Sequence, residues 1–307
     1  MRTKGMNMKT SMLANAKFLL LTFLFGMPLA ASAQDVEIDE TNFPDENFRN
    51  YLLAQDYGAD GILTAEEIGG VTLIDVYNKG ITSLKGIEHF VALTYLYCFT
   101  NQLTELDVSK NTELTYLDCS ANHLTTLDVS GCTALINLFC ESNQLTALDI
   151  SNNTKLRRLE CYSNQLTALD MSKNTALTEV YCYNNQIKGT SMDALMAGLP
   201  ENSTNKSYLL RIYDSVNNDG NVCTKAQVAA AKAKGWAVYY HYYYDDTMGW
   251  AEYEGSDAEE TAITRPVAET VDASAPVYTL SGQKVNGGSL SGKKGIYIIG
   301  GKKVVVK

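Results

Sequence analysis

Cysteine is the most chemically reactive residue type in this sequence of 307 residues, which contains seven of them. Five recur at a fixed interval of 21 residues: Cys98, Cys119, Cys140, Cys161 and Cys182. Stacked on adjacent parallel strands, they would lie about 4.8 Å apart, farther than the Cβ separation of about 3.8 Å that a disulfide prefers. No C-x-x-C pair and no Cys/His metal spacing accompanies them. We therefore expect small, buried, apolar side chains rather than disulfides or metal ligands.

A second group of residues carries oxygen atoms that could bind a cation. Residues 43–71 predict a helix, a loop and a helix, and the loop resembles the calcium loop of EF-hand proteins. The candidate ligands, at positions 1, 5, 7, 9 and 12 of that loop, are Asp56, Asp60, the carbonyl of Ile62, Thr64 and Glu67. Gly58 departs from the pattern at position 3. The alternative is purely structural, because Thr64 and Glu67 also form a capping box. Calcium is the one cofactor that the sequence suggests.

Catalytic groups do not converge in the sequence. The three histidines, His89, His123 and His241, fall in different predicted elements without a matching nucleophile or base. The carboxylates of Asp118 and Glu160 would lie two strands apart, about 10 Å, which exceeds the roughly 6.5–9.5 Å of inverting glycosidases. We expect no catalytic residues and no enzymatic activity.

A repeat of 21 residues positions most of these side chains. Complete units begin at residues 93, 114, 135 and 156, a shortened unit begins at 177, and a 22-residue unit begins at 71. In their common frame, L-x-x-L-x-C-x-x-N-x-L, the segment around the cysteine predicts a short strand. Its Leu and Cys point inward, because successive side chains of a strand take opposite faces. The asparagine of each unit follows the strand, where its amide is expected to bond backbone groups of the turn and the neighbouring coil.

This frame resembles the leucine-rich repeat family, with cysteine at the third apolar position. The resemblance implies a leucine-rich repeat solenoid, a β-rich α/β fold in which each coil buries its inner face against the next. We expect the repeats at residues 71–199, between a small helical N-terminal cap (34–70) and an α/β C-terminal cap (200–254). A linker (255–275) then leads to a short C-terminal β tail (276–307).

The strand positions that point outward carry many aromatic side chains. Positions 3, 5 and 7 of the six units comprise eighteen residues, of which nine are aromatic, although aromatic residues make up 9% of the chain. Solenoids present their concave surface to ligands, and exposed aromatic patches mark interaction sites. The predicted ligand-binding residues are Tyr95, Tyr97, Phe99, Tyr116, Asp118, Phe139, Arg158, Glu160, Tyr162, Tyr181 and Tyr183.

The same aromatic residues have a structural explanation. Tyrosine is a good strand former, and pairs such as Tyr95 with Tyr116, and Tyr162 with Tyr183, would stabilise the sheet across strands. As binding groups, the rings could stack on sugars while the acids bond hydroxyl groups, or they could anchor a protein partner. Both explanations remain open at the level of the sequence.

The segments after the repeats predict an α/β cap and a β-meander. Helices are expected at 191–199 and 224–235, and strands at 208–214 and 236–244. The end of the tail, with Gly295, Tyr297, Lys302, Lys303 and Lys307, resembles the C-terminal sorting signals of Bacteroidetes-type bacteria. Together with the repeats and the N-terminal loop, this resemblance implies a leucine-rich repeat surface protein of that group. A folded β-module of unknown use is the alternative for the tail.

Residues 1–33 predict export. Basic residues, an apolar run at 18–30 and the sequence Ala-Ser-Ala before Gln34 are typical of a cleaved secretory signal peptide. No later apolar run is long enough to span a membrane. Residues 34–275 hold 15 Lys and Arg against 35 Asp and Glu, a net charge of −20, which disfavours nucleic acid and anionic lipid as partners.

We therefore expect an exported, secreted or outer-surface interaction protein of bacterial type, with a protein or glycan ligand, which the host of the bacterium could supply. The alternative function is that of a structural surface protein that associates with itself through the same outward face.

Overall fold

The computed structural model describes residues 35–202, 208–217, 219–244 and 247–257, together with three strands of the tail at 277–279, 295–299 and 302–306. The predicted signal peptide, most of the predicted linker and Lys307 lie outside the described residues. Within the described ranges, no helix combines the length and the apolar character needed to cross a membrane.

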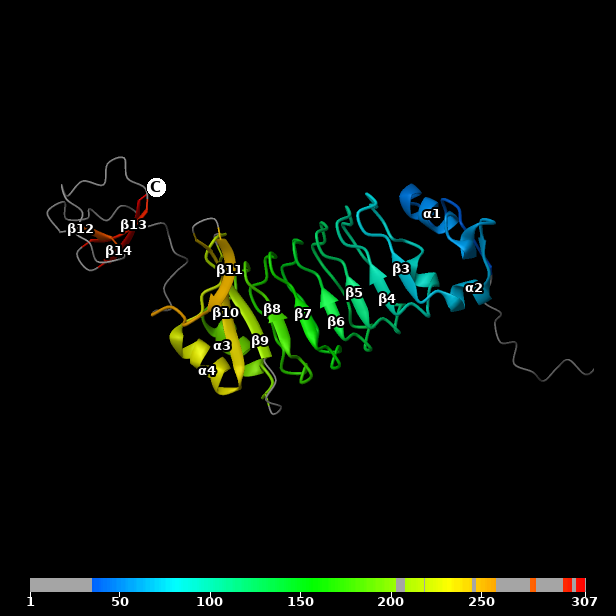
Figure 1. Ribbon diagram of the computed structural model, residues 1–307. Coiled ribbons are helices and arrows are strands. Elements are labelled where there is room, and N and C mark those ends of the chain that lie inside the picture. Colours follow the sequence, from blue (N-terminus) through cyan, green and yellow to red (C-terminus); the bar gives the residue numbers. More distant parts are fainter. Residues whose placement is uncertain are drawn as a thin grey trace, which may run out of the picture.

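A nine-stranded sheet runs through the described chain (Figure 1). The repeats contribute six parallel strands: β3 (Leu73–Asp75), β4 (Tyr95–Tyr97), β5 (Tyr116–Asp118), β6 (Asn137–Phe139), β7 (Arg158–Glu160) and β8 (Glu179–Tyr181). These strands pair in constant register, so that Leu96, Leu117 and Leu138 lie side by side. The fold is the leucine-rich repeat solenoid that the sequence predicts. Between β3 and β8, where every residue is described, the only helical segment is the short 3-10 helix η2 (Ile87–His89).

The cysteine ladder lies in the core, as predicted. Leu96 and Cys98 of the first repeat strand, and the equivalent residues of every later coil, have no exposed surface. All seven cysteines are free and buried. Removal from water raises the pKa of their thiols, to about 11 at Cys132 and about 12 at Cys223, so that they are neutral at physiological pH. The ladder therefore contributes apolar packing and no crosslinks.

Asparagine side chains join each coil to the preceding one, as predicted. The amide of Asn143 donates hydrogen bonds to the carbonyl oxygens of Cys119 (3.0 Å) and Cys140 (3.2 Å), and its Oδ1 accepts one from the backbone N–H of Leu124 (2.9 Å). The preceding residue, Ser142, has a positive φ of 54°. The amide thus satisfies the backbone groups that this left-handed turn removes from strand pairing. The same arrangement recurs at Asn101, Asn122, Asn164 and Asn185.

A second asparagine ladder occupies a later turn of the coils, and we did not predict it. Asn111, Asn153 and Asn174 are fully buried, and each amide donates to two carbonyl oxygens. Cys132 takes the same place in the second repeat, where its thiol lies 3.4 Å from the carbonyl oxygen of Val108. The 21-residue spacing of these asparagines was visible in the sequence, although Cys132 interrupts it.

The N-terminal cap consists of α1 (Glu46–Leu53), the 3-10 helix η1 (Asp56–Gly58) and α2 (Ala65–Gly70). A short antiparallel pair of β1 (Val36–Glu37) and β2 (Ile62–Leu63), which we did not predict, joins its two ends. Asp45 connects the cap to the first coil. Its Oδ1 accepts a hydrogen bond from Phe48 N at the start of α1 (2.9 Å), and its Oδ2 accepts bonds from the backbone and hydroxyl of Thr82 (2.8 and 2.7 Å).

The C-terminal cap continues the sheet. It contains α3 (Thr190–Gly198), β9 (Tyr208–Asp214), α4 (Lys225–Ala233) and β10 (Trp236–Tyr244), close to the predicted elements. β9 pairs in parallel with β8, which places Arg211 opposite Tyr181, and β10 pairs in parallel with β9. β11 (Thr247–Glu252), which we did not predict, adds an antiparallel edge strand. In the tail, β12 (Val277–Thr279), β13 (Gly295–Ile299) and β14 (Lys302–Val306) form the antiparallel meander that the alternating pattern predicts.

Candidate functional site

The outward side of the sheet is the candidate site, and we call it the aromatic face. It comprises the third, fifth and seventh positions of the repeats and their continuation on β9 and β11. Strand alternation places these side chains opposite the buried Leu and Cys residues. At the N-terminal end of this face, Leu73, Tyr77 and Tyr95 are 49%, 50% and 42% exposed. Leu73 and Tyr95 are neighbours in register, so the exposed apolar surface is shared between adjacent strands.

Four rings form a connected cluster over β4, β5 and β6. Tyr116 is at its centre, with ring centroids 6.1 Å from Tyr95, 4.9 Å from Tyr97 and 5.1 Å from Phe139. All three contacts are tilted, as the quadrupoles of aromatic rings favour. The predicted pair of Tyr95 and Tyr116 is therefore confirmed, and it is part of a larger patch.

Two further pairs stack face to face at the seventh position. The rings of Tyr77 and Phe99 lie 4.9 Å apart, and those of Tyr162 and Tyr183 lie 4.4 Å apart. The second pair was predicted from the sequence. The stacking contributes to the stability of the sheet, as the structural explanation requires. It also fixes the rings in place, so that they lose little side-chain entropy when a partner binds.

An alternating stack of rings and guanidinium groups crosses the C-terminal half of the aromatic face. The Arg158 guanidinium lies 5.4 Å from the Phe139 ring and 5.2 Å from the Tyr181 ring. The Arg211 guanidinium lies 4.2 Å from the same Tyr181 ring and 4.3 Å from the Trp250 ring. These distances are within the range of cation–π attraction.

Three carboxyl groups lie in the middle of the aromatic face, on Asp118, Glu141 and Glu160. Burial raises the pKa of each, to about 8 for Glu141. Hydrogen bonds from Ser120 counteract this effect at Asp118, and Arg158 counteracts it at Glu160. The Oε2 of Glu141 is buried and has no hydrogen-bond partner among the described residues. Glu141 is therefore mostly neutral at pH 7.

The structure brings the eleven predicted ligand-binding residues onto one face, but their side chains differ in exposure to solvent. Glu160 and Tyr181 are only 7% and 6% exposed, so they support their neighbours more than they offer surface. The sequence prediction missed Arg211 and Trp250, which extend the face into the C-terminal cap. The alternation of "YLLRIYD" in β9 was the available sign for Arg211, whereas Trp250 lies on the strand that we did not predict.

The predicted calcium loop has a different internal structure from the one that its residue types suggest. Glu67 closes a capping box, because its Oε2 accepts hydrogen bonds from the N–H (2.8 Å) and the hydroxyl (2.7 Å) of Thr64. Asp60 Oδ1 accepts a bond from Ile62 N (3.0 Å). A Cβ atom at Gly58 would lie 2.3 Å from the carbonyl oxygen of Leu52, so this position admits no side-chain ligand. Within the described chain, no three Asp, Glu, His or Cys residues gather as a metal site.

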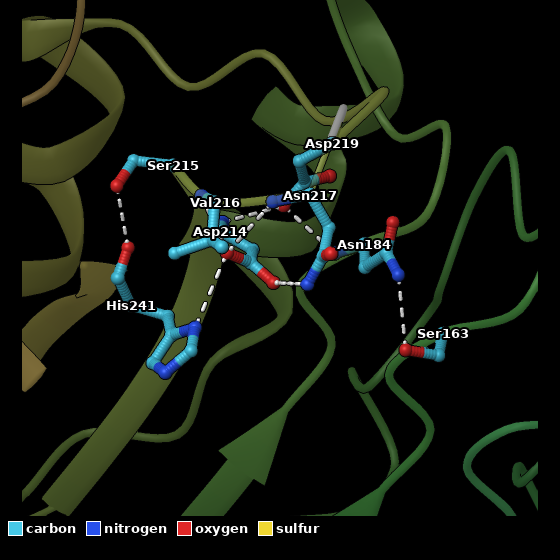
Figure 2. A network of polar contacts seen from close by, with 8 residues as sticks. All are labelled: Ser163, Asn184, Asp214, Ser215, Val216, Asn217, Asp219 and His241. Carbon is cyan, nitrogen blue, oxygen red and sulfur yellow. Dashed lines mark hydrogen bonds and ion pairs between the residues drawn. The ribbon is translucent and has the colours of Figure 1, made fainter. Parts of the chain in front are cut away.

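The polar network in Figure 2 closes the last repeat against the cap. Asp219 accepts hydrogen bonds from the backbone N–H of Asn184 (2.7 Å) and Asp214 (2.8 Å), and burial raises its pKa to about 6. His241 Nδ1 lies 3.2 Å from Asp214 Oδ1. The hydroxyl of Ser215 donates to the backbone carbonyl of His241 (2.7 Å) and not to its ring. The network therefore lacks the nucleophile–base contact of a hydrolytic site.

Comparison with known proteins supports the fold. No protein-family model matches the chain. Internalin J of Listeria monocytogenes serotype 4b (strain F2365) is 43% identical over 71 residues, which are 23% of this chain and 8% of that protein. The crystal structure of the internalin InlF from Listeria monocytogenes (strain 4b F2365) matches with a TM-score of 0.52 and 24% identity, over 69% of this chain and 59% of that one.

A third match concerns the functional domain of InlJ from Listeria monocytogenes, a structure described as including a cysteine ladder. It is 31% identical, with a TM-score of 0.44, over 60% of this chain and 44% of that chain. The chain thus spans less than two thirds of the length of each of these relatives. Of the two structures, that of InlF has a TM-score above 0.5, and its likeness to this chain shows the solenoid fold alone.

Proposed function

We propose that the protein is an exported interaction protein that binds a protein partner on its aromatic face and catalyses no reaction. The observation that carries this proposal is the continuous run of aromatic rings and arginines across the outward side of the sheet, from Tyr95 and Tyr97 on β4 to Trp250 in the C-terminal cap.

The composition of the aromatic face supports a protein partner. Tyrosine, tryptophan and arginine are the residues that contribute most binding energy in protein interfaces. Pairing among these side chains accounts for the order of the rings but not for their exposure, which reaches 50% at Tyr77 and 42% at Tyr95. From β3 to β11 the face extends over eight strand spacings, about 38 Å, which is long enough for a standard interface.

Export and surface location belong to the same proposal. They rest on the signal peptide predicted at residues 1–33 and on the sorting-signal resemblance of the tail. The acidic character of the chain fits an extracellular partner with basic groups. On the aromatic face itself, the carboxyl group of Asp118 lies beside the mostly neutral Glu141 and the Arg158-paired Glu160.

A double substitution tests the proposal. Tyr97→Ala with Phe139→Ala removes two of the three rings that contact Tyr116. We expect it to weaken binding to a partner identified in a broad protein and glycan screen at least about tenfold, since hot-spot side chains contribute about 2 kcal/mol or more. The matched control is Thr125→Ala with Thr146→Ala, two exposed residues outside the aromatic face in coils of the same type.

Three results would contradict the proposal. Equal binding by the double variant and the control would show that the ring cluster is not the site. A screen that yields only glycan ligands would replace the protein partner by a sugar. Oligomers that form with increasing concentration, and that the double variant dissolves in light-scattering measurements, would show that the face binds a second copy of the chain.

A further inference from the structure

Arg158 and Arg211 occupy the same alternating stack but have different charge environments. Arg158 is neutralised on two sides, by Glu160 Oε1 at 2.5 Å and by Glu179 Oε2 at 3.2 Å. No carboxylate of the described residues lies within 4.0 Å of the Arg211 guanidinium. Glu160 is near enough for the positive charge of Arg211 to lower its pKa, but Arg158 already occupies its carboxylate.

The two rings beside Arg211 determine which part of the guanidinium is available. The guanidinium carbon of Arg211 lies over the faces of both rings, 4.2 Å from the centroid of Tyr181 and 4.3 Å from that of Trp250. Cation–π contact uses these faces and makes no demand on the N–H donors at the edge. Tyr183, whose ring contacts Trp250 at 5.0 Å, holds the indole in position. Among the described residues, the donors of Arg211 therefore have no anionic acceptor.

We infer that Arg211 is a carboxylate-binding subsite of the aromatic face, which recognises an Asp or Glu side chain of the protein partner. The inference rests on the proposed function. A guanidinium binds a carboxylate through two parallel N–H···O bonds, and a group already held between two rings loses little entropy when it does so. Partly buried charge pairs are also screened less by salt than exposed ones.

The charge of the neighbouring surface defines the partner more closely. Asp118, Glu141 and Glu160 face the centre of the aromatic face, and a partner needs basic or hydrogen-bonding groups there. Arg211 lies four strands from Asp118, about 19 Å away. Since Glu141 is mostly neutral and Glu160 is paired with Arg158, the complementary segment carries a basic or hydrogen-bonding group over Asp118 on β5 and one carboxylate over β9. This separation of charges would set the orientation of the bound partner.

The test uses the whole mature protein and two small probes, N-acetyl-glutamate N-methylamide and the corresponding glutamine compound. They have the same shape and differ by one negative charge. In two-dimensional NMR at constant ionic strength, we expect the Nε–Hε resonance of Arg211 to shift and saturate at millimolar concentrations of the glutamate probe. The glutamine probe should bind at least about tenfold more weakly. Arg158 is the internal control, and its resonance should stay in place because Glu160 and Glu179 already hold it.

Variants make the assignment specific. Arg211→Met keeps the packing of the stem against Tyr181 and should remove the response of Trp250 fluorescence to the glutamate probe. Arg211→Lys keeps the charge but not the fork, and it should weaken the response about tenfold. Because the titration of the wild-type protein needs no substitution, a variant that folds poorly does not affect the outcome.

Several results would overturn the inference. They are an Arg211 resonance that never saturates, equal responses to both probes, and equal shifts of Arg158 and Arg211, which would indicate general ionic attraction. These failures are distinct from a failure of the proposed function. Tyr97 and Phe139 lie on β4 and β6, at least three strands from Arg211 on β9. Their replacement by alanine should leave the Arg211 response unchanged, whether or not a partner still binds.

Discussion

The amide of Asn143 donates a hydrogen bond of 3.0 Å to the carbonyl oxygen of Cys119, one coil earlier in the chain. This contact joins the two ladders of the repeat. The backbone carbonyl of each of these cysteines accepts a hydrogen bond from the asparagine of the next coil. The polar ladder of asparagines therefore covers the end of the apolar ladder of cysteines. Each coil therefore depends on its neighbour for both burial and hydrogen bonding.

Asn143→Ala should lower the free energy of unfolding by about 3 kcal/mol. The substitution leaves the N–H of Leu124 buried without its partner, at about 1–3 kcal/mol, and it removes one of the two amide hydrogen bonds that the carbonyls of Cys119 and Cys140 each accept. Chemical denaturation of the purified protein measures the loss. Asn152→Ala is the control, because Asn152 is exposed and makes one long contact of 3.4 Å to Ser130, and its effect should stay within about 0.5 kcal/mol. Similar effects of the two variants would contradict the role of the asparagine ladder.

The seven thiols should be inert in the folded protein. All are buried, and burial raises their pKa, to about 11 even at Cys132, so little thiolate exists at pH 8. We expect a thiol-specific reagent to label none within minutes in native buffer and all seven in denaturant, as counted by intact mass. Thr146→Cys adds an exposed thiol in a ladder coil and should react at once. Rapid labelling of the parent protein would show that the core opens readily.

Glu141 should make stability depend on pH. Burial raises its pKa in the folded state to about 8, above the value near 4.5 of an unfolded chain. Folding therefore takes up a proton, and the stabilising contribution is complete below pH 4.5 and is lost as pH rises towards 8. The slope from one group is at most about 1.4 kcal/mol per pH unit.

Glu141→Gln isolates this effect, because it keeps the shape and removes the titration. Asp219, whose pKa burial raises to about 6, changes in the same direction in both proteins and cancels in the comparison. We expect the unfolding free energy of the wild-type protein to fall relative to that of Glu141→Gln between pH 5 and 8, as measured by denaturation at each pH. A constant difference would mean that Glu141 titrates normally.

The N-terminal cap allows a direct test of the calcium hypothesis. Glu67→Ala removes the capping box of α2 and should lower the free energy of unfolding by about 1 kcal/mol in chelator alone. The exposed neighbour Glu66 is the matched control, and Glu66→Ala should have little effect. If calcium binds the loop, calcium should raise the melting temperature of the parent protein and not that of Glu67→Ala. No calcium effect on the parent would leave the capping box as the sole role of these residues.

The period of the repeat determined most of the fold. Because a solenoid coil contacts only its neighbours, a residue that recurs every 21 positions meets its own equivalent in the next coil, and contacts follow from the spacing alone. Hence the sequence predicts the burial of Cys98 and its equivalents, the role of Asn143 and the pairing of Tyr162 with Tyr183. The same reasoning places the outward residues on one face.

Only the tertiary structure decided the features that do not repeat. Arg211 and Trp250 come from strands that join the sheet after the period ends, and the contacts of Arg211 with Tyr181 and Trp250 depend on how the C-terminal cap packs. Gly58 excludes a side chain because the carbonyl of Leu52 lies beside it. The raised pKa of Glu141 results from burial between the coils of β5 and β7, which supply Asp118 and Glu160 as neighbours. In each case the deciding contact joins residues whose proximity no sequence pattern indicates, because it is the folding of the chain that brings them together.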